Sequence, residues 1–274
     1  MPVELGLAAT QRALRSAAQR TAALLRGIRD PNIRAAGLEW TIAETAAHLV
    51  ASLDLYTGLV TGERDPTIFL EASAHAGSPA ERNAIRSALS LTECQERDIH
   101  RLADMLVPRA ERFIAKGQGR DYDVALMTET GVAMTIPMMT AVMLGEELLH
   151  GLDIARSVRA PWAISRHEAI LVIEGVVAMF PAYLDKDKAA GVHVAYELRL
   201  RGGPRYRIAI DDGTAIIATP VEKIDCWISA DPVAFLLLGY GRAGQWSQTL
   251  RGKIIVGGRK PWLGLRFSDY TSGP

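Results

Sequence analysis

The spacing of apolar residues predicts helices over about the first 185 residues of the chain. Apolar side chains recur every three or four positions, and several of these segments begin with helix-capping residues. Thr41 with Glu44, and Ser165 with Glu168, each have the spacing of a capping box. We therefore expect a short extended piece around residues 121–127 and five helices, over about 5–29, 41–62, 78–116, 135–158 and 165–184.

Beyond residue 190 the apolar period changes from helical to alternating, which predicts strands. The sequence Asp211-Asp212-Gly213 between two alternating segments is typical of a β-hairpin. Asp231, followed by Pro232, predicts the start of one helix among the strands. We expect a short C-terminal helix and an antiparallel sheet with strands over about 192–200, 206–210, 214–219, 225–229 and 252–258.

This change of period predicts a multi-domain protein. We expect an all-α helical bundle over 1–160 and a connecting helix with a linker over 161–190. A small α+β domain with an antiparallel sheet should follow over 191–274. No internal repeat interrupts this two-domain order.

Composition and net charge indicate the class of protein and the kinds of partner to exclude. Of the 274 residues, 49% are hydrophobic and 23% are charged, which is typical of a globular chain. The formal net charge is zero, so we expect neither nucleic acid nor a membrane as a partner. No apolar run approaches the ~20 residues of a membrane span, and the N-terminus lacks a signal-peptide pattern. Cys94 and Cys226 are too few for a disulfide framework, so we expect a cytoplasmic protein with buried, inert thiols.

The predicted fourth helix combines an apolar surface with four polar side chains in two turns: Glu146, Glu147, His150 and Asp153. A helix that is apolar on both sides is buried, and a buried carboxylate needs a counter-charge, hydrogen bonds or a metal ion. Glu146 and His150 are four residues apart and share a face, so both can bind one cation. Glu147 with His150 is the second choice, because a spacing of three residues aims the two side chains less well.

A third ligand must come from another helix, and His48 is the strongest candidate. The small residues Thr45 and Ser52 lie on its face of the second predicted helix and leave room above the imidazole. The other histidines lie in polar or exposed contexts or in a capping box. The second and fourth helices of a bundle can face each other across its core, where metal sites are built. The alternative for His48 is a hydrogen-bonded core histidine without a metal.

Several segments resemble one known family. Trp40 and Thr41 are followed by Glu44 and His48, and about a hundred residues later comes Glu–x3–His–Gly–x–Asp over 146–153. Together with the C-terminal segments DDGTA, ADPVAFLLLGYGR and GKIIVGG, they resemble the mycothiol-dependent maleylpyruvate isomerase family. The resemblance implies a DinB-like metal-binding four-helix bundle followed by a small sterol-carrier-type α+β domain.

The resemblance also implies roles for individual residues. It implies His48, Glu146 and His150 as metal ligands and Arg242 as a polar group that reaches the site. Asp153, one turn after His150, is a candidate for orienting that ligand. The alternatives are a structural ion pair for Asp153 and a helix-terminal charge for Arg242.

Such a site implies a chemistry. Three protein ligands leave a coordination position open, and a cation there would hold a thiol as the nucleophilic thiolate. In the resembled family the thiol is mycothiol, and the reaction either isomerises a small electrophilic substrate or transfers the thiol to it. Arg242 is suited to bind a carboxylate of such a substrate. Zinc is the first expectation for the metal, with nickel or iron as alternatives. The ligand set also suits the facial triad of non-haem iron oxygenases.

A different class of function is also compatible with the sequence. Sterol-carrier-type domains bind apolar ligands, and FLLLGY over 235–240 could line such a tunnel, with a vestigial metal site in the bundle. We interpret FLLLGY, and the methionine stripe over 134–143, as core packing. The metal content of the purified protein separates the enzyme from the carrier.

Overall fold

The structure is a computed structural model that describes residues 6–218 and 223–271. The chain forms two compact units, a helical unit of residues 6–77 and 81–164 and a sheet unit from residue 165 onward. Among the described residues, no helix has the length and apolar character needed to cross a bilayer. The predicted start of the first helix at Leu5, and Thr219 at the end of a predicted strand, lie outside the described residues.

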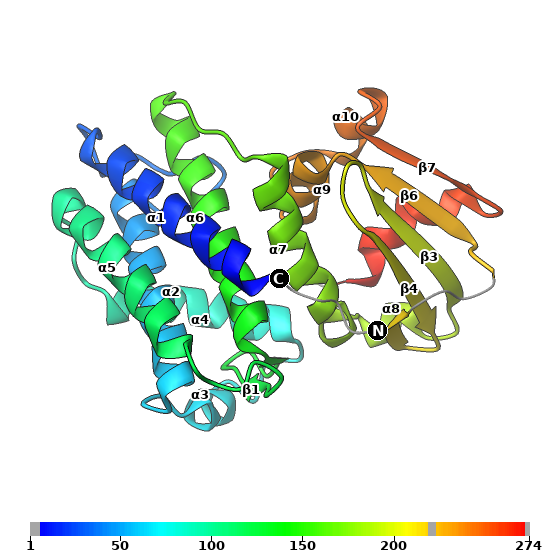
Figure 1. Ribbon diagram of the computed structural model, residues 1–274, viewed down its shortest axis with the longest axis horizontal. Coiled ribbons are helices and arrows are strands. Elements are labelled where there is room, and N and C mark those ends of the chain that lie inside the picture. The colour runs from blue at the N-terminus through cyan, green and yellow to red at the C-terminus, as the bar shows by residue number, and fades with distance from the viewer. Residues whose placement is uncertain (1–5, 219–222, 272–274) are drawn as a thin grey trace. The chain divides into compact units, whose positions relative to one another are not determined.

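Four long helices make up the core of the helical unit. Helices α1 and α2 each pack against both α5 and α6 (Figure 1). A two-stranded ribbon, Leu126–Met127 (β1) with Ala133–Met134 (β2), lies before α6. It contains only the last two residues of the extended piece predicted over 121–127, because the chain makes a turn at residues 122 and 123. The helices are α1 (Leu7–Arg26), α2 (Ile42–Thr61), α3 (Pro66–Ala72), α4 (Pro79–Glu93), α5 (Ile99–Gly117) and α6 (Ile136–Val158).

The predicted capping signals for α2 and α6 are confirmed. Thr41 accepts a hydrogen bond from the backbone N–H of Glu44, whose carboxylate accepts one from Thr41 in return. Thr135 caps α6, and Gly62 ends α2 in the left-handed region at φ 77°. These local signals fix where the two ligand-bearing helices begin.

The single helix predicted over 78–116 is wrong, because the chain breaks between α4 and α5. Asp98 accepts hydrogen bonds from the backbone N–H of His100 and Arg101 and so begins a new helix. Arg97 donates to the carbonyl oxygen of Cys94, next to the end of α4. No glycine or proline lies in this segment, so the usual breaker signals are missing from the sequence.

The sheet unit contains a five-stranded sheet in the order β5-β4-β3-β6-β7. Apolar side chains alternate along its strands and bury one face, as Val194, Tyr196, Leu198 and Leu200 do on β3. The strands are β3 (His193–Leu200), β4 (Arg205–Asp211), β5 (Thr214–Ala218), β6 (Cys226–Ala230) and β7 (Ile254–Gly258).

The predicted all-antiparallel sheet is wrong at one pair, because β6 runs parallel to β3. The β4–β5 hairpin forms as predicted, with Asp212 and Gly213 at positive φ. A hairpin fixes the direction of its two strands locally, whereas β3 and β6 are separated by β4 and β5. Only the packing of the whole sheet decides the direction of β6.

Helices α7 (Arg166–Met179) and α9 (Pro232–Gly239) pack against each other in the sheet unit. Helix α7 ends earlier than predicted, because Pro181 lacks a backbone N–H and the chain continues as the 3₁₀ helix η1 (Phe180–Tyr183). The short helices α8 (Lys186–Ala189) and α10 (Gln245–Leu250) had no sequence signal that we used, and the C-terminal helix is a 3₁₀ helix, η2 (Pro261–Tyr270). The division at 160 and 190 stays a prediction.

Candidate metal centre

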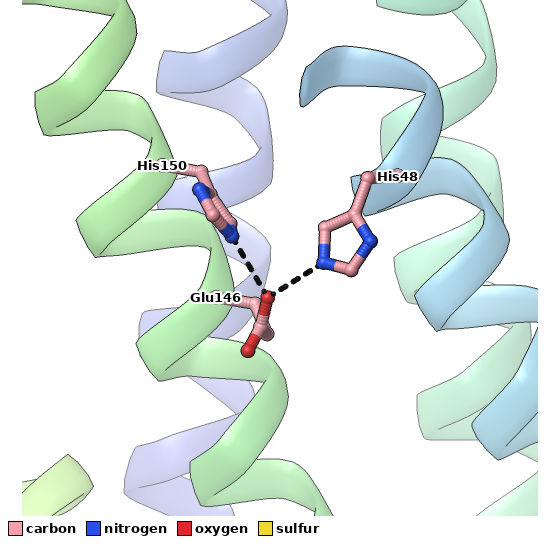
Figure 2. Close-up of side chains that lie close together, drawn as sticks. All are labelled: His48, Glu146 and His150. Carbon is pink, nitrogen blue, oxygen red and sulfur yellow. Dashed lines mark hydrogen bonds and ion pairs between the residues drawn. The ribbon is translucent and has the colours of Figure 1, made fainter. Parts of the chain in front are cut away.

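His48 on α2 and Glu146 and His150 on α6 point toward one another in the helical unit (Figure 2). Oε2 of Glu146 lies 3.1 Å from Nε2 of His48 and 3.2 Å from Nε2 of His150. The three donor atoms all lie within 4.8 Å of one another. In the part of the chain that the structure describes, this is the one cluster of three histidine, cysteine or acidic side chains with such geometry.

These distances fit a single cation. Zinc binds imidazole nitrogen and carboxylate oxygen at about 2.0–2.2 Å, so two ligands of a tetrahedral ion lie about 3.4 Å apart. Two histidines and one glutamate are also the protein ligands of known catalytic zinc sites, which keep the fourth position open.

The surroundings of His48 favour Nε2 as its ligand atom. The hydroxyl of Ser90 donates to the carbonyl oxygen of Ser87 at 2.5 Å, which leaves its oxygen free to accept from Nδ1 of His48 at 2.8 Å. When a cation binds between the two side chains, the proton of the neutral ring is on Nδ1 and Nε2 supplies the lone pair; without a cation, the 3.1 Å hydrogen bond to the Glu146 carboxylate requires a proton on Nε2. The indole of Trp40 lies beside the same imidazole, with 5.0 Å between the ring centroids.

His150 has Asp153 as a more distant neighbour. Oδ2 of Asp153 lies 3.5 Å from Nδ1 of His150, and the Asp153 side chain is 1% exposed. An orienting partner on one nitrogen leaves the other, Nε2, directed at Glu146. The orienting role of Asp153 stays a prediction.

The charges at the site follow from burial and pairing. Burial lowers the pKa of His48, although hydrogen bonding to Glu146 opposes this effect. Burial also acts to raise the pKa of Glu146, but the hydrogen bonds with His150 and His48 outweigh it and hold this pKa far below its usual range. Glu146 is thus a carboxylate and His48 a neutral imidazole, the forms in which both side chains bind metal ions.

His150 differs from His48 because it has two acidic neighbours. Burial acts to lower its pKa, but Asp153 and Glu146 outweigh this effect and raise the pKa of His150 to about 9. A cation that takes Nε2 must therefore displace a proton from this ring at neutral pH.

Glu147, our second choice of ligand, is not part of the cluster. Its side chain is buried, and burial raises the pKa of Glu147 to about 7, so about half of this carboxyl group is protonated at neutral pH. The one-residue difference from Glu146 rotates it about 100° around α6.

Arg242 lies in the sheet unit just after α9, and its Nη1 donates to the carbonyl oxygen of Tyr240 at 2.7 Å. A role for Arg242 at the metal centre stays a prediction. Cys94 and Cys226 are both free and buried, and burial raises the pKa of each thiol, in agreement with the inert thiols that we expected.

Sequence reasoning missed Ser90 and Gly151. Ser90 is in α4, which we had predicted as part of a longer helix, so nothing linked it to His48. Gly151 lies against the indole of Trp162, where an added Cβ would come within 2.1 Å of Cζ2. Trp162 Nε1 also donates to the carbonyl oxygen of Leu148. The indole therefore packs against α6 at Gly151, the residue that follows His150 in the sequence.

The sheet unit holds a separate cavity of about 280 Å³. Its lining is mostly apolar and comes from η1, the buried face of the sheet, α9, α10 and η2. Phe235, Leu238, Gly239 and Tyr240 of the FLLLGY segment line it, so our interpretation of this segment as simple core packing is wrong for these four residues. On α6, in contrast, Met139 and Met143 are core as expected, at most 2% exposed, whereas Met138 is half-buried.

The fold is similar to that of known proteins, although no family model and no curated protein matches the sequence. The crystal structure of the mycothiol-dependent maleylpyruvate isomerase has a TM-score of 0.52 and 14% identity over 92% of this chain and 93% of that chain. A histidine-to-alanine variant of that enzyme has a TM-score of 0.51 and 13% identity over the same shares. These likenesses show a shared fold along nearly the whole length.

A weaker likeness is to the inverting sec-alkylsulfatase Pisa1 from Pseudomonas sp.. Its TM-score is 0.34 at 13% identity, over 50% of this chain and 24% of that chain. This chain thus spans about a quarter of the length of the alkylsulfatase, and the likeness carries no argument.

Proposed function

We propose that this protein is a metal-dependent enzyme that uses a small thiol cofactor, with mycothiol as the first candidate. The enzyme would either isomerise a small electrophilic substrate or transfer the thiol to it. The observation that carries the proposal is the position of Glu146 Oε2 between the Nε2 atoms of His48 and His150. The fold shared with a mycothiol-dependent isomerase supports the choice of thiol.

His48, Glu146 and His150 would hold the divalent cation, with zinc as the first candidate and nickel or iron as alternatives. When bound, the cation supplies a positive charge that lowers the pKa of a coordinated thiol and favours the thiolate. Ser90 and Asp153 keep the two imidazoles in register, so little rearrangement is needed on binding.

The substrate in this proposal is a small electrophile that bears a carboxylate. Arg242 is the residue proposed to bind that carboxylate, because a guanidinium pairs with it through two parallel hydrogen bonds. Neither cysteine of the chain is accessible as a nucleophile, which is consistent with an external thiol.

Metal analysis of the purified protein tests the metal centre. We expect about one equivalent of zinc, nickel or iron, and its loss in His48→Ala and in His150→Ala. His100→Ala is the matched control, because His100 is exposed on α5 of the same unit. Full metal content in both site variants would contradict the assignment of the ligands.

A thermal-shift and turnover screen of the metal-loaded protein tests the thiol. Mycothiol, glutathione, bacillithiol and cysteine are compared, each with electrophiles that carry a conjugated double bond and a carboxylate. The proposal requires that at least one thiol stabilises the protein and supports turnover, and that His48→Ala abolishes both effects.

A second candidate function is binding of an apolar small molecule in the sheet unit, and the 280 Å³ cavity favours it. An engineered apolar cavity of about 150 Å³ already binds benzene, so this volume is sufficient for a ligand. We expect the dye Nile red to fluoresce with the wild type and to lose about tenfold in affinity in Leu238→Trp, which fills the cavity. Ile216→Trp, on the exposed face of β5, is the control; equal binding by both variants would contradict this candidate.

A further inference from the structure

Helix α10 has two differently used faces. Gln245 and Thr249 line the apolar cavity. Trp246 and Leu250, one position further along, are 66% and 85% exposed. A surface helix normally buries its large apolar residues and exposes its polar ones, so α10 has the reverse arrangement. The two exposed side chains are four residues apart and therefore lie side by side.

The chain around α10 is locally basic although the whole protein is neutral. Between Pro232 and Ser268 there are six lysines and arginines and no aspartate or glutamate, but Arg259 and Lys260 pair with Asp225, and Arg266 pairs with Asp269. Arg251 and Lys253 follow α10 directly, and both are exposed. Arg201 adds a third cation, since its guanidinium donates to the carbonyl oxygen of Gly252 at 2.7 Å. We expected no membrane partner because the total charge of the chain is zero. A local cluster of basic residues leaves this total unchanged, so the total charge does not exclude such a partner.

We propose that the α10 patch, formed by Trp246, Leu250, Arg251 and Lys253, docks the protein on the surface of an anionic lipid bilayer. Tryptophan is the residue most typical of the membrane–water interface, and an exposed leucine next to it gains by entering the acyl region. Exposed cations beside them meet the anionic headgroups.

Charge and position favour a bilayer over a protein partner. Protein interfaces are depleted of lysine at their centre, whereas lipid-binding surfaces combine cations with exposed tryptophan. Because α10 also lines the cavity, docking through α10 brings the cavity next to the bilayer, which contains apolar molecules. This purpose rests on the second candidate function, but docking itself does not depend on it.

Co-sedimentation of the full chain with vesicles tests the proposal. One set of vesicles is pure phosphatidylcholine, and the other contains about one third phosphatidylglycerol. We expect at least tenfold tighter binding to the anionic vesicles, and a loss of most of this difference in 1 M salt. Arg251→Gln with Lys253→Gln should weaken anionic binding by about 30-fold, which corresponds to about 2 kcal/mol.

The apolar contribution is tested with Trp246→Ser combined with Leu250→Ser. This variant should bind both kinds of vesicle at least tenfold more weakly, since it replaces the two apolar side chains that enter the acyl region by polar ones. Ile216→Ser is the matched control, because Ile216 is 61% exposed on β5 and should leave binding unchanged. All substituted side chains are exposed, so unchanged thermal midpoints are expected and confirm folding.

Three outcomes would overturn the proposal. The wild type could fail to bind anionic vesicles, or the Trp246→Ser, Leu250→Ser variant could bind as well as the control. A dimer in light scattering that this variant dissociates would assign the patch to self-association instead. Leu238→Trp is expected to keep vesicle binding, so loss of cavity binding and loss of docking are distinguishable.

Discussion

At the scale of single residues, the site depends on which nitrogen of each histidine faces Glu146. The hydrogen bond from His48 Nδ1 to Ser90 favours Nε2 as the ligand atom of one ring, and the carboxylate of Asp153 lies 3.5 Å from Nδ1 of the other, His150. Ser90 therefore acts through His48 and needs no contact with a ligand of its own.

Ser90→Ala tests this positioning role. We expect metal affinity to fall by about 10- to 100-fold, the usual effect of removing a hydrogen-bond partner from a metal-binding histidine. Stability without metal should change by only about 1 kcal/mol. Competition with a chromogenic chelator measures the affinity, and Ser90→Thr, which keeps the hydroxyl, should restore most of it. A purely structural role would lower the thermal midpoint and leave the affinity unchanged.

At the scale of secondary-structure elements, caps and hairpins followed their local sequence signals, while breaks and strand directions did not. The capping boxes at Thr41 and Ser165 formed as predicted, because their hydrogen bonds join residues only three apart. The break after α4 is made by local hydrogen bonds of Arg97 and Asp98, in a segment without a glycine or proline breaker. The parallel pairing of β6 with β3, in contrast, joins segments that are far apart in the chain.

Asp225 illustrates such a long-range contact, since it joins β6 to two other parts of the sheet unit. It accepts hydrogen bonds from the backbone N–H of Ala195 at 3.1 Å and from Arg259 at 2.6 Å. Burial acts to raise the pKa of Asp225, but these hydrogen bonds and Lys260 outweigh it and lower the pKa below its usual value of 3.8.

A carboxyl group whose pKa is lower in the folded state stabilises the fold above its unfolded pKa and loses this effect as pH falls through the folded pKa. We therefore expect Asp225→Asn to be about 1 kcal/mol less stable than the wild type at pH 7, since Arg259 is exposed and its pairing is screened. The difference should shrink below about pH 4. Urea unfolding across this range measures it, and a difference that persists unchanged at pH 2 would contradict the assignment.

At the scale of the whole molecule, the metal centre and the apolar cavity belong to different compact units. All three ligands come from the helical unit, and the whole cavity lining comes from the sheet unit. A ligand at either site is therefore expected to stabilise its own unit first.

Calorimetry of the full chain tests this independence. At a metal concentration 100 times the Kd, binding adds about 2.7 kcal/mol to the unit that holds the ion, or roughly 5–10 °C in its midpoint. We expect two unfolding transitions, of which zinc raises one, and His150→Ala should abolish that shift. Equal shifts of both transitions would show that the two units unfold together.

The sequence by itself determined the helices and strands with clear periods, the caps that begin them, and the placement of Glu146 and His150 on one face of α6. It did so because these features depend on residues within about one or two helical turns. The small residues on its helix face made His48 the candidate for the third ligand, and the resemblance implied the same residue. Only the tertiary structure decided that Ser90 reaches His48, that β6 runs parallel to β3, and that FLLLGY lines a cavity instead of filling a core. Each of these depends on packing between segments far apart in the chain, which no local pattern encodes.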